Sequence, residues 1–311
     1  MNDHFGDLHV PVLETEALAA LALRPDGCYV DCTFGRGGHS GRILEQLGPQ
    51  GHLFAIDRDP AAAQAAQRFA DDSRFTFARA RFSELAALAQ QWEISGMTDG
   101  ILLDLGVSSP QLDQGERGFT FMQDGPLDMR MDDSAGVTAA QWLAGVREEE
   151  LARVLYEYGE ERFARRIARG VVAAREAAPI DTTAKLVDII GRAVPRKPRD
   201  IHFATRTFQA IRIAINEELD ELQRVLPMAL DILARGGRMV VISFHSLEDR
   251  IVKRFMRALA RPPAGDDLPI MPVKFEPKLL LIGKAVRAGD EEMVRNRRAR
   301  SAIMRVAEKC A

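Results

Sequence analysis

The residues best able to do chemistry gather where an apolar run near the N-terminus ends. Asp31-Cys32-Thr33-Phe34 leads into Gly35-Arg36-Gly37-Gly38-His39, and Asp57 follows twenty residues after Gly37. Glycines let a ligand approach the main chain closely because they carry no side chain. A carboxylate at Asp57 could accept both hydroxyls of an adenosine ribose. The spacing favours a nucleotide cofactor over a plain tight turn, and it leaves nicotinamide dinucleotides and S-adenosyl-L-methionine both open.

Two residues further along the chain bear on the choice of cofactor. Phe82 follows an expected strand, where its ring could cover an adenine face; an ordinary core phenylalanine is the alternative. Asp104 lies at the end of the expected strand 100–105 and is followed by Leu105-Gly106-Val107-Ser108-Ser109-Pro110-Gln111. An acidic residue at an apolar strand end is costly to bury without a partner. In class I methyltransferases this place holds the residues that meet the target nitrogen, so Asp104 favours S-adenosyl-L-methionine.

The elements that must position these residues follow from the apolar pattern. Strands are expected at 28–32, 52–56, 75–77, 100–105, 238–244, 279–282 and 301–306. Helices are expected at 14–23, 40–47, 60–69, 82–92, 148–178, 208–230 and 249–260. Alternating strands and helices predict a parallel sheet covered on both faces, and continuous apolar strands agree with this. Because 112–214 contains no convincing strand, we expect an α/β sheet with a helical insertion after the fourth strand.

Composition excludes several classes of protein. The 311 residues are 46% hydrophobic and 28% charged, as in a globular protein of one large or two moderate domains. The formal net charge is -3, so nucleic-acid binding would need local basic patches. Three cysteines, an odd number, argue against a disulfide framework and favour a reducing cytoplasm. No signal peptide or membrane-spanning apolar run is visible, so we expect a cytoplasmic protein with no membrane partner.

Five blocks of the sequence carry a resemblance: Thr33–Ser40, Ala55–Pro60, Asp104–Asp113, Gly125–Met131 and Ser243–Arg250. They resemble one known family, the bacterial ribosomal RNA small-subunit methyltransferases H, also called MraW. The resemblance covers nearly the whole chain, and the blocks are too long to match by chance. It implies a cytoplasmic enzyme that uses S-adenosyl-L-methionine to methylate the exocyclic N4 of a cytidine. That cytidine lies in the decoding region of small-subunit (16S) ribosomal RNA.

The resemblance also implies a fold and a set of site residues. The fold would be a class I, Rossmann-like methyltransferase sheet in two parts, residues 1–112 and 214–311, with an inserted all-helical substrate-recognition domain over 113–213. The cofactor-binding residues would be Gly37, Gly38, His39, Asp57, Phe82, Asp104 and Gln111. The partner would be small-subunit ribosomal RNA or the assembled subunit, and the oligomeric state, including a homodimer, stays open.

Methylation of a cytosine amine sets requirements for the catalytic residues. The nitrogen is a poor nucleophile, so an acceptor for its N–H must stabilise the developing charge. Asp104, Ser108 and Ser109 are the catalytic candidates. Many amino-methyltransferases carry Asn/Asp/Ser-Pro-Pro-aromatic here, whereas this chain has Ser109-Pro110-Gln111-Leu112. The stacking ring must come from elsewhere, and Phe119 and Phe121 are candidates, with anchoring of the insertion as the alternative.

The remaining polar motifs admit a functional and a structural interpretation. His245 could be a general base, although a structural hydrogen-bonding role is favoured. The six histidines show no metal-ligand spacing, so we expect no catalytic metal. Two basic clusters could contact RNA phosphates, or could be solvated charged faces. The first comprises Arg196, Lys197, Arg199, Arg206 and Arg212, with His202 and Phe203 interleaved; the second comprises Arg295, Arg297, Arg298 and Arg300.

Three other functions remain as alternatives. A nicotinamide-dependent oxidoreductase would share the glycine turn and Asp57, but it leaves the segment 104–111 unexplained. A non-catalytic RNA-binding or ribosome-assembly protein would have degraded cofactor motifs, and here they are intact. A methyltransferase for DNA cytosine or another nucleobase would share the fold, because fold alone does not define the substrate.

Overall fold

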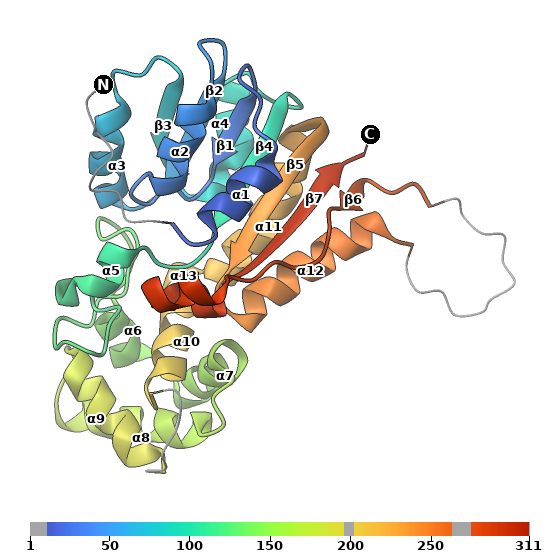
Figure 1. The fold of residues 1–311 in the computed structure, drawn as a ribbon. Coiled ribbons are helices and arrows are strands. Elements are labelled where there is room, and N and C mark those ends of the chain that lie inside the picture. Colours follow the sequence, from blue (N-terminus) through green and yellow to red (C-terminus); the bar gives the residue numbers. More distant parts are fainter. Residues whose placement is uncertain (1–10, 196–201, 263–274, 311) are drawn as a thin grey trace, which may run out of the picture. The chain divides into compact units, whose positions relative to one another are not determined.

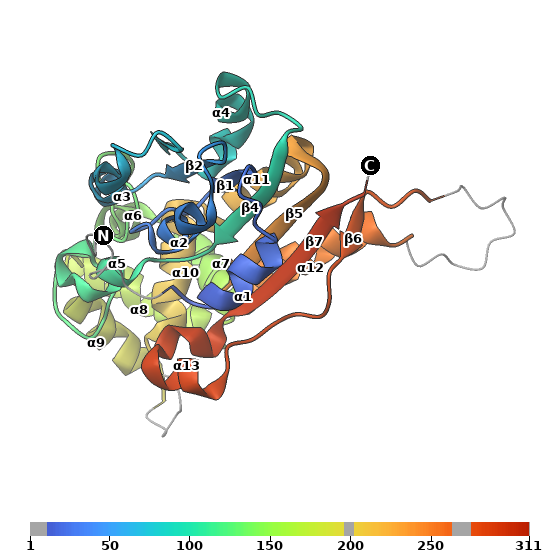
Figure 2. The same cartoon turned by 45° about the horizontal axis from the view of Figure 1, so that its top comes forward.

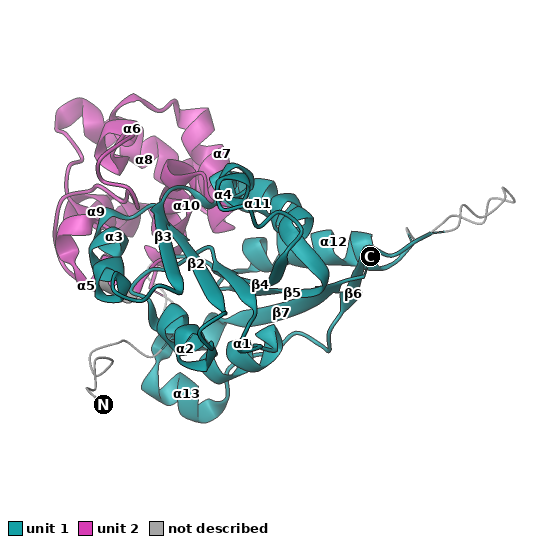
Figure 3. Cartoon of the chain, turned by 90° about the horizontal axis from the view of Figure 1, so that it is seen from above, with its two compact units in different colours: residues 1–106, 219–311 teal, residues 107–218 magenta. Residues whose placement is uncertain are grey.

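The chain forms two compact units. The computed structural model describes residues 11–195, 202–262 and 275–310. Unit 1 consists of Met1–Gly106 and Leu219–Ala311, and unit 2 of Val107–Glu218 (Figure 3). The chain therefore leaves unit 1 two residues after the fourth strand and returns to it well before the fifth. Each unit has a hydrophobic core of its own.

Unit 1 is built on a seven-stranded sheet with the order β3-β2-β1-β4-β5-β7-β6 (Figure 1). The strands are β1 (Cys28–Asp31), β2 (His52–Asp57), β3 (Phe75–Arg79), β4 (Thr98–Asp104), β5 (Leu233–Ser243), β6 (Leu279–Leu281) and β7 (Ile303–Lys309). The pairings among β1 to β5 are parallel, and β7 is antiparallel to both of its neighbours. This sheet confirms the predicted class I methyltransferase fold.

Helices cover both faces of this sheet because successive strand residues point to opposite sides. Tyr29 packs in one core and Val30 in the other. The first core is covered by α1 (Glu14–Leu21), α2 (Gly38–Gln46) and α3 (Pro60–Ala66), and the second by α4 (Leu85–Gln91), α11 (Glu218–Ile232) and α12 (Ser246–Ala260). Figure 2 shows α1 and α2 on the side of the sheet opposite to α4 and α11. The C-terminal part adds α13 (Asp290–Arg295) and η4 (Arg297–Ser301).

Unit 2 is helical. Its helices are α5 (Ser109–Asp113), α6 (Ala139–Gly145), α7 (Glu148–Gly159), α8 (Ala164–Ala177), α9 (Thr183–Ala193) and α10 (Thr205–Asn216). The glycine-rich segment before α6 is ordered by Arg117, which donates to the carbonyl oxygens of Arg130 and Met131 at 3.1 and 2.9 Å. A single isolated bridge, Pro126 to Thr182, joins this segment to the start of α9.

Two of the predicted helices were wrong in their extent. The predicted helix 148–178 is divided, because Glu160 adopts a left-handed backbone with φ 49° after α7. A Cβ on Gly159 would lie 2.5 Å from the carbonyl oxygen of Arg206, so α7 and α10 approach closely there. The predicted helix 208–230 is divided at Glu217, with φ 53°, into α10 and α11. Pro227 ends neither part, since α11 continues to Ile232.

Within the described ranges, no helix combines the length and the apolar character needed to cross a membrane. The cysteines Cys28, Cys32 and Cys310 are free.

Candidate active site

The glycine turn after β1 is held by aromatic packing. The Phe34 ring lies against Phe69, Phe75 and Phe77, with ring centroids 5.9, 5.7 and 5.3 Å away. Gly37 has φ 77°, and a Cβ there would lie 2.7 Å from the Phe34 ring. Only glycine meets both conditions, the left-handed backbone and the space. Because α2 begins at Gly38, directly after the glycine turn, the N–H groups of its first turn have no partner within the helix.

Asp57 ties this turn to the end of β2. Its Oδ2 accepts a hydrogen bond from the Gly35 amide at 2.7 Å, and its Oδ1 accepts one from the Asp59 amide at 2.9 Å. Burial raises the pKa of Asp57 to about 6, although both amides favour the charged form. Each carboxylate oxygen has a further lone pair. The side chain can therefore still accept the two hydroxyls of a ribose.

A buried network at the end of β1 was missed by sequence reasoning. Asp31 Oδ2 accepts from Ser40 Oγ at 2.7 Å, and Asp31 Oδ1 accepts from the Thr33 amide at 3.0 Å. Thr33 Oγ1 in turn accepts from the amide of Asp104 at 2.6 Å. Burial raises the pKa of Asp31. An acidic residue closing an apolar strand was the available signal, and it indicated Asp31 as clearly as it indicated Asp104.

His39 and Asp104 meet beside this network. His39 Nε2 lies 3.5 Å from Asp104 Oδ2. Burial lowers the pKa of His39, but the carboxylates of Asp104 and Asp31 outweigh it and raise the pKa overall. Among the described residues, Asp104 Oδ1 and both imidazole nitrogens are buried without a hydrogen bond. A buried polar atom without a partner costs about 1–3 kcal/mol, so these atoms suit contact with a polar ligand.

Phe82 lies just beyond β3. The Ala80 amide donates to the Asp57 carbonyl oxygen at 3.0 Å, which holds this segment beside the end of β2. Phe82 begins η2 (Phe82–Glu84), is half-buried, and packs at the margin of the core that contains Leu85. Its position fits either a ring over a nucleobase or a residue of the core margin.

The segment after β4 enters unit 2. Gln111, in α5, is buried, and its Oε1 accepts from the Ser108 amide at 2.8 Å, which closes the first turn of this short helix. Ser109 is the first residue of α5. Phe119 is 5% exposed and belongs to the core of unit 2. The Phe121 ring stacks on His202, with centroids 4.6 Å apart and an interplanar angle of 12°.

Comparison with known proteins decides the family. A model of the MraW methylase family matches residues 6–310. The chain belongs to this family. It is 58% identical over 309 residues to the ribosomal RNA small subunit methyltransferase H of Thioalkalivibrio sulfidiphilus, covering 97% of this chain and 98% of that protein. It is 54% identical over 306 residues to the protein of the same name from Pseudoalteromonas atlantica, again covering 97% and 98%.

One solved structure, an rRNA methylase from Streptococcus thermophilus, aligns at 10% identity with a TM-score of 0.42; the alignment covers 96% of this chain and 95% of that chain.

As a MraW methylase, the protein takes its methyl group from S-adenosyl-L-methionine. The residues at the ends of β2 and β4 suit this cofactor in charge. Asp57 retains acceptors for a diol, and Asp104 retains an unpaired acceptor that suits an ammonium or amine. These features converge within unit 1.

In this MraW protein, His245 caps α12. The Glu248 amide approaches His245 Nδ1 at 3.5 Å, and Glu248 Oε2 accepts from the His245 amide at 3.2 Å. His245 Nε2 also lies 3.2 Å from Glu248 Oε1. This reciprocal arrangement is a capping box, which favours the structural interpretation of His245 over the general base.

The structure places the residues of the two basic clusters in different environments in this MraW protein. Arg196, Lys197 and Arg199 lie outside the described residues. Arg206 is exposed on α10 and donates to the Glu160 carbonyl oxygen at 3.0 Å. Arg212 forms a bidentate ion pair with Glu218 at 2.8 Å, so its charge is neutralised. The second cluster lies on α13 and η4, where Arg295, Arg297 and Arg300 are exposed.

Proposed function

We propose that this MraW methylase transfers a methyl group from S-adenosyl-L-methionine to the exocyclic N4 of a cytidine in the decoding region of small-subunit (16S) ribosomal RNA. Two relatives at 58% and 54% identity carry the name ribosomal RNA small subunit methyltransferase H, and they match over nearly their full lengths. The observation that carries the chemistry is Asp104, whose buried Oδ1 has no hydrogen bond among the described residues.

The proposed cofactor site is assigned to residues at, or shortly after, the carboxyl ends of the parallel strands. Asp57 accepts the ribose hydroxyls, and Phe82 covers the adenine. Gly37 and Gly38 let the methionine part approach the start of α2. His39, Asp104 and Gln111 complete the set, and Asp31 acts as a positioning residue through Ser40 and Thr33. Asp57 and Asp31 lie at the carboxyl ends of parallel strands, where ligands bind in such sheets, and this supports the assignment.

The reaction requires orientation and charge stabilisation more than a strong base. The bound cofactor supplies an electrophilic methyl group on a sulfonium. The protein must hold the cytosine nitrogen in line with the bond that breaks, because its lone pair is conjugated into the ring. Asp104 accepts an N–H of the amine and stabilises the positive charge that develops on nitrogen. The methylated nitrogen is then acidic enough to lose its proton to water.

Ser108 and Ser109 are the second source of acceptors for the amine. They follow Asp104 closely in the chain, and Ser109 begins α5. Their hydroxyls can accept hydrogen bonds from the amine but carry no charge. They would therefore stabilise the positive charge on the nitrogen less than the carboxylate does.

The function is tested by methyl transfer from labelled S-adenosyl-L-methionine to small ribosomal subunits from cells that lack this gene. Naked 16S RNA and duplex DNA run in parallel, and the labelled nucleoside is identified by mass spectrometry. We expect N4-methylcytidine from subunits or RNA. Label in another nucleoside, label in DNA alone, or cofactor binding without any transfer to RNA or subunits would overturn the proposal.

A further inference from the structure

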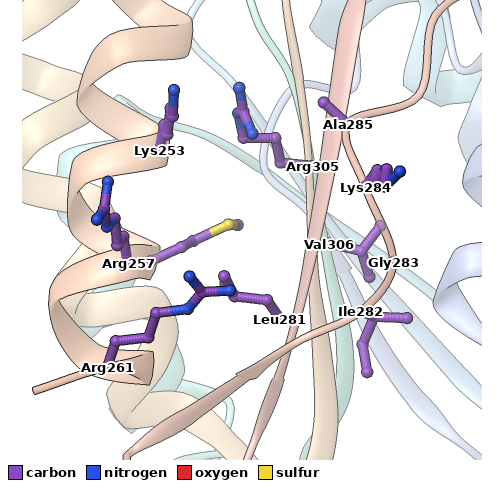
Figure 4. Close-up of a pocket in the computed structure, with 11 residues that line it drawn as sticks. Lys253, Arg257, Arg261, Leu281, Ile282, Gly283, Lys284, Ala285, Arg305 and Val306 are labelled. Carbon is purple, nitrogen blue, oxygen red and sulfur yellow. The ribbon is translucent and has the colours of Figure 1, made fainter.

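A row of cations runs along α12. Acidic side chains occur only in its first turn, and the later turns carry Lys253, Arg254 and Arg257, with Arg261 just after the helix. Lys253, Arg257 and Arg261 recur at a spacing of four residues, which places them on one face of the helix. This face looks toward the β6–β7 edge of the sheet in unit 1 (Figure 4).

Between this face and the sheet edge lies a cavity of about 240 Å³. Five cations line it: Lys253 and Arg257 from α12, Arg261 just after that helix, Lys284 from the segment after β6, and Arg305 from β7. Its other walls are mostly apolar, with Met256, Leu281 and Val306 among them, and none of the described residues that line it is acidic. We call this cavity the basic groove.

Most of the charge in the basic groove is not compensated. Arg305 is held by Asp249 through bonds of 2.7 and 3.0 Å, so it is fixed and neutralised. In the described ranges, Lys253, Arg257, Arg261 and Lys284 form no ion pair with a carboxylate. Like charges that converge on one cavity repel each other, and a bound anion relieves that repulsion.

The basic groove begins near the reacting end of the sheet. Arg305 is in register with Val241 on β5, and Val241 with Leu103 on β4, the residue before Asp104. Adjacent strands lie about 4.8 Å apart, so two spacings separate β7 from β4 by about 10 Å. A polyanion whose reacting base lies at Asp104 could place neighbouring backbone phosphates in the groove.

We propose that the basic groove binds backbone phosphates of the substrate RNA next to the methylated nucleotide. This inference rests on the proposed function. Phosphate contacts position a nucleic acid without reading its sequence, which suits cations on flexible stems along an apolar wall. The basic clusters visible in the sequence do not include it, because its cations come from three separate segments.

The test compares the double variant Lys253→Gln/Arg257→Gln with a matched control, Arg235→Gln/Arg254→Gln. Both remove two exposed positive charges from unit 1, and the control residues do not line the groove. Affinity for a fragment of 16S RNA is measured by fluorescence anisotropy between 50 and 300 mM salt, together with KM, kcat and the Kd for S-adenosylhomocysteine.

We expect the groove variant to raise the Kd and KM for RNA about tenfold at low salt and to leave kcat and cofactor affinity unchanged. The slope of log affinity against log salt should fall by about 1.4, at about 0.7 per lost single-strand contact. The control should stay close to wild type. The charge-conserving variant Lys253→Arg/Arg257→Lys should retain RNA affinity, which separates loss of charge from loss of folding.

The proposal would be overturned if the groove variant, the control and wild type had the same affinity for RNA and the same slope of log affinity against log salt. Failure of the proposed function looks different, because wild type would then transfer no methyl group to RNA or subunits. In that case the RNA affinities alone decide: weakening confined to the groove variant still supports phosphate binding, and no difference overturns it.

Discussion

The amide of Gly35 donates a 2.7 Å hydrogen bond to Oδ2 of Asp57, so one carboxylate both shapes the glycine turn and faces the expected ribose position. Removal of this carboxylate therefore weakens the glycine turn and also removes the acceptor for the ribose hydroxyls. The Asp57→Ala protein should bind S-adenosylhomocysteine about 10- to 100-fold more weakly, since hydrogen bonds to a charged group contribute about 1.5–3 kcal/mol each. Isothermal titration calorimetry measures the change.

Asp72→Ala is the matched control for that variant. Asp72 pairs with Arg74 just before β3 begins, at the end of the sheet opposite to Asp57. The control should lose some stability and keep its affinity for S-adenosylhomocysteine. Equal weakening in both variants would mean that Asp57 acts only through general stability.

The pKa of Asp57, raised by burial to about 6, predicts that cofactor affinity depends on pH. Only the carboxylate can accept both ribose hydroxyls, so affinity for S-adenosylhomocysteine should fall as pH falls below about 6, by up to tenfold per pH unit. Calorimetry from pH 5 to pH 8 tests this, with Asp57→Asn as the control that should show a flatter profile. The same steep profile in Asp57→Asn would assign the titration to another group, such as Asp31.

The raised pKa of Asp57 makes folding stability depend on pH in the direction opposite to cofactor affinity. Between its ordinary value and about 6, the folded protein holds a proton on Asp57 that the unfolded chain has lost. The contribution of Asp57 to stability therefore falls as pH rises through that window and is lost above it. Wild type should gain less than Asp57→Asn in thermal midpoint as pH rises from 4 to 6.

Sequence reasoning located the strands, the glycine turn and the strand-end carboxylates of Asp57 and Asp104, because apolar runs and glycines are local signals. The breaks at Glu160 and Glu217 were not predictable, since both are non-glycine residues in a left-handed backbone. The bond between Thr33 and Asp104 joins residues 71 positions apart, and no local pattern encodes it. The basic groove was missed for the same reason.

Gly37 offers a test of why the turn needs glycine. Gly37→Ala would combine a left-handed backbone with a Cβ 2.7 Å from the Phe34 ring, so we expect a loss of about 3 kcal/mol in the free energy of unfolding. Gly236→Ala is the control, because Gly236 has the same φ of 77° and nothing within 4 Å of a Cβ. It should lose only about 1–2 kcal/mol from the backbone. Urea unfolding compares the two, and equal losses would show that the ring contact relaxes freely.

Asp104 is the residue whose role separates catalysis from cofactor binding. Asp104→Asn keeps the side-chain shape and the backbone bond to Thr33, but it removes the charge that stabilises the reacting amine. We expect kcat to fall about 100- to 1000-fold, as for the loss of one preorganised electrostatic contact. The Kd for S-adenosylhomocysteine should change much less. Asp113→Asn, an exposed carboxylate of α5, is the control and should keep full activity. If Asp104→Asn weakened cofactor binding in proportion to turnover, Asp104 would be a cofactor ligand alone, and Ser108 and Ser109 would become the first candidates to meet the cytosine amine.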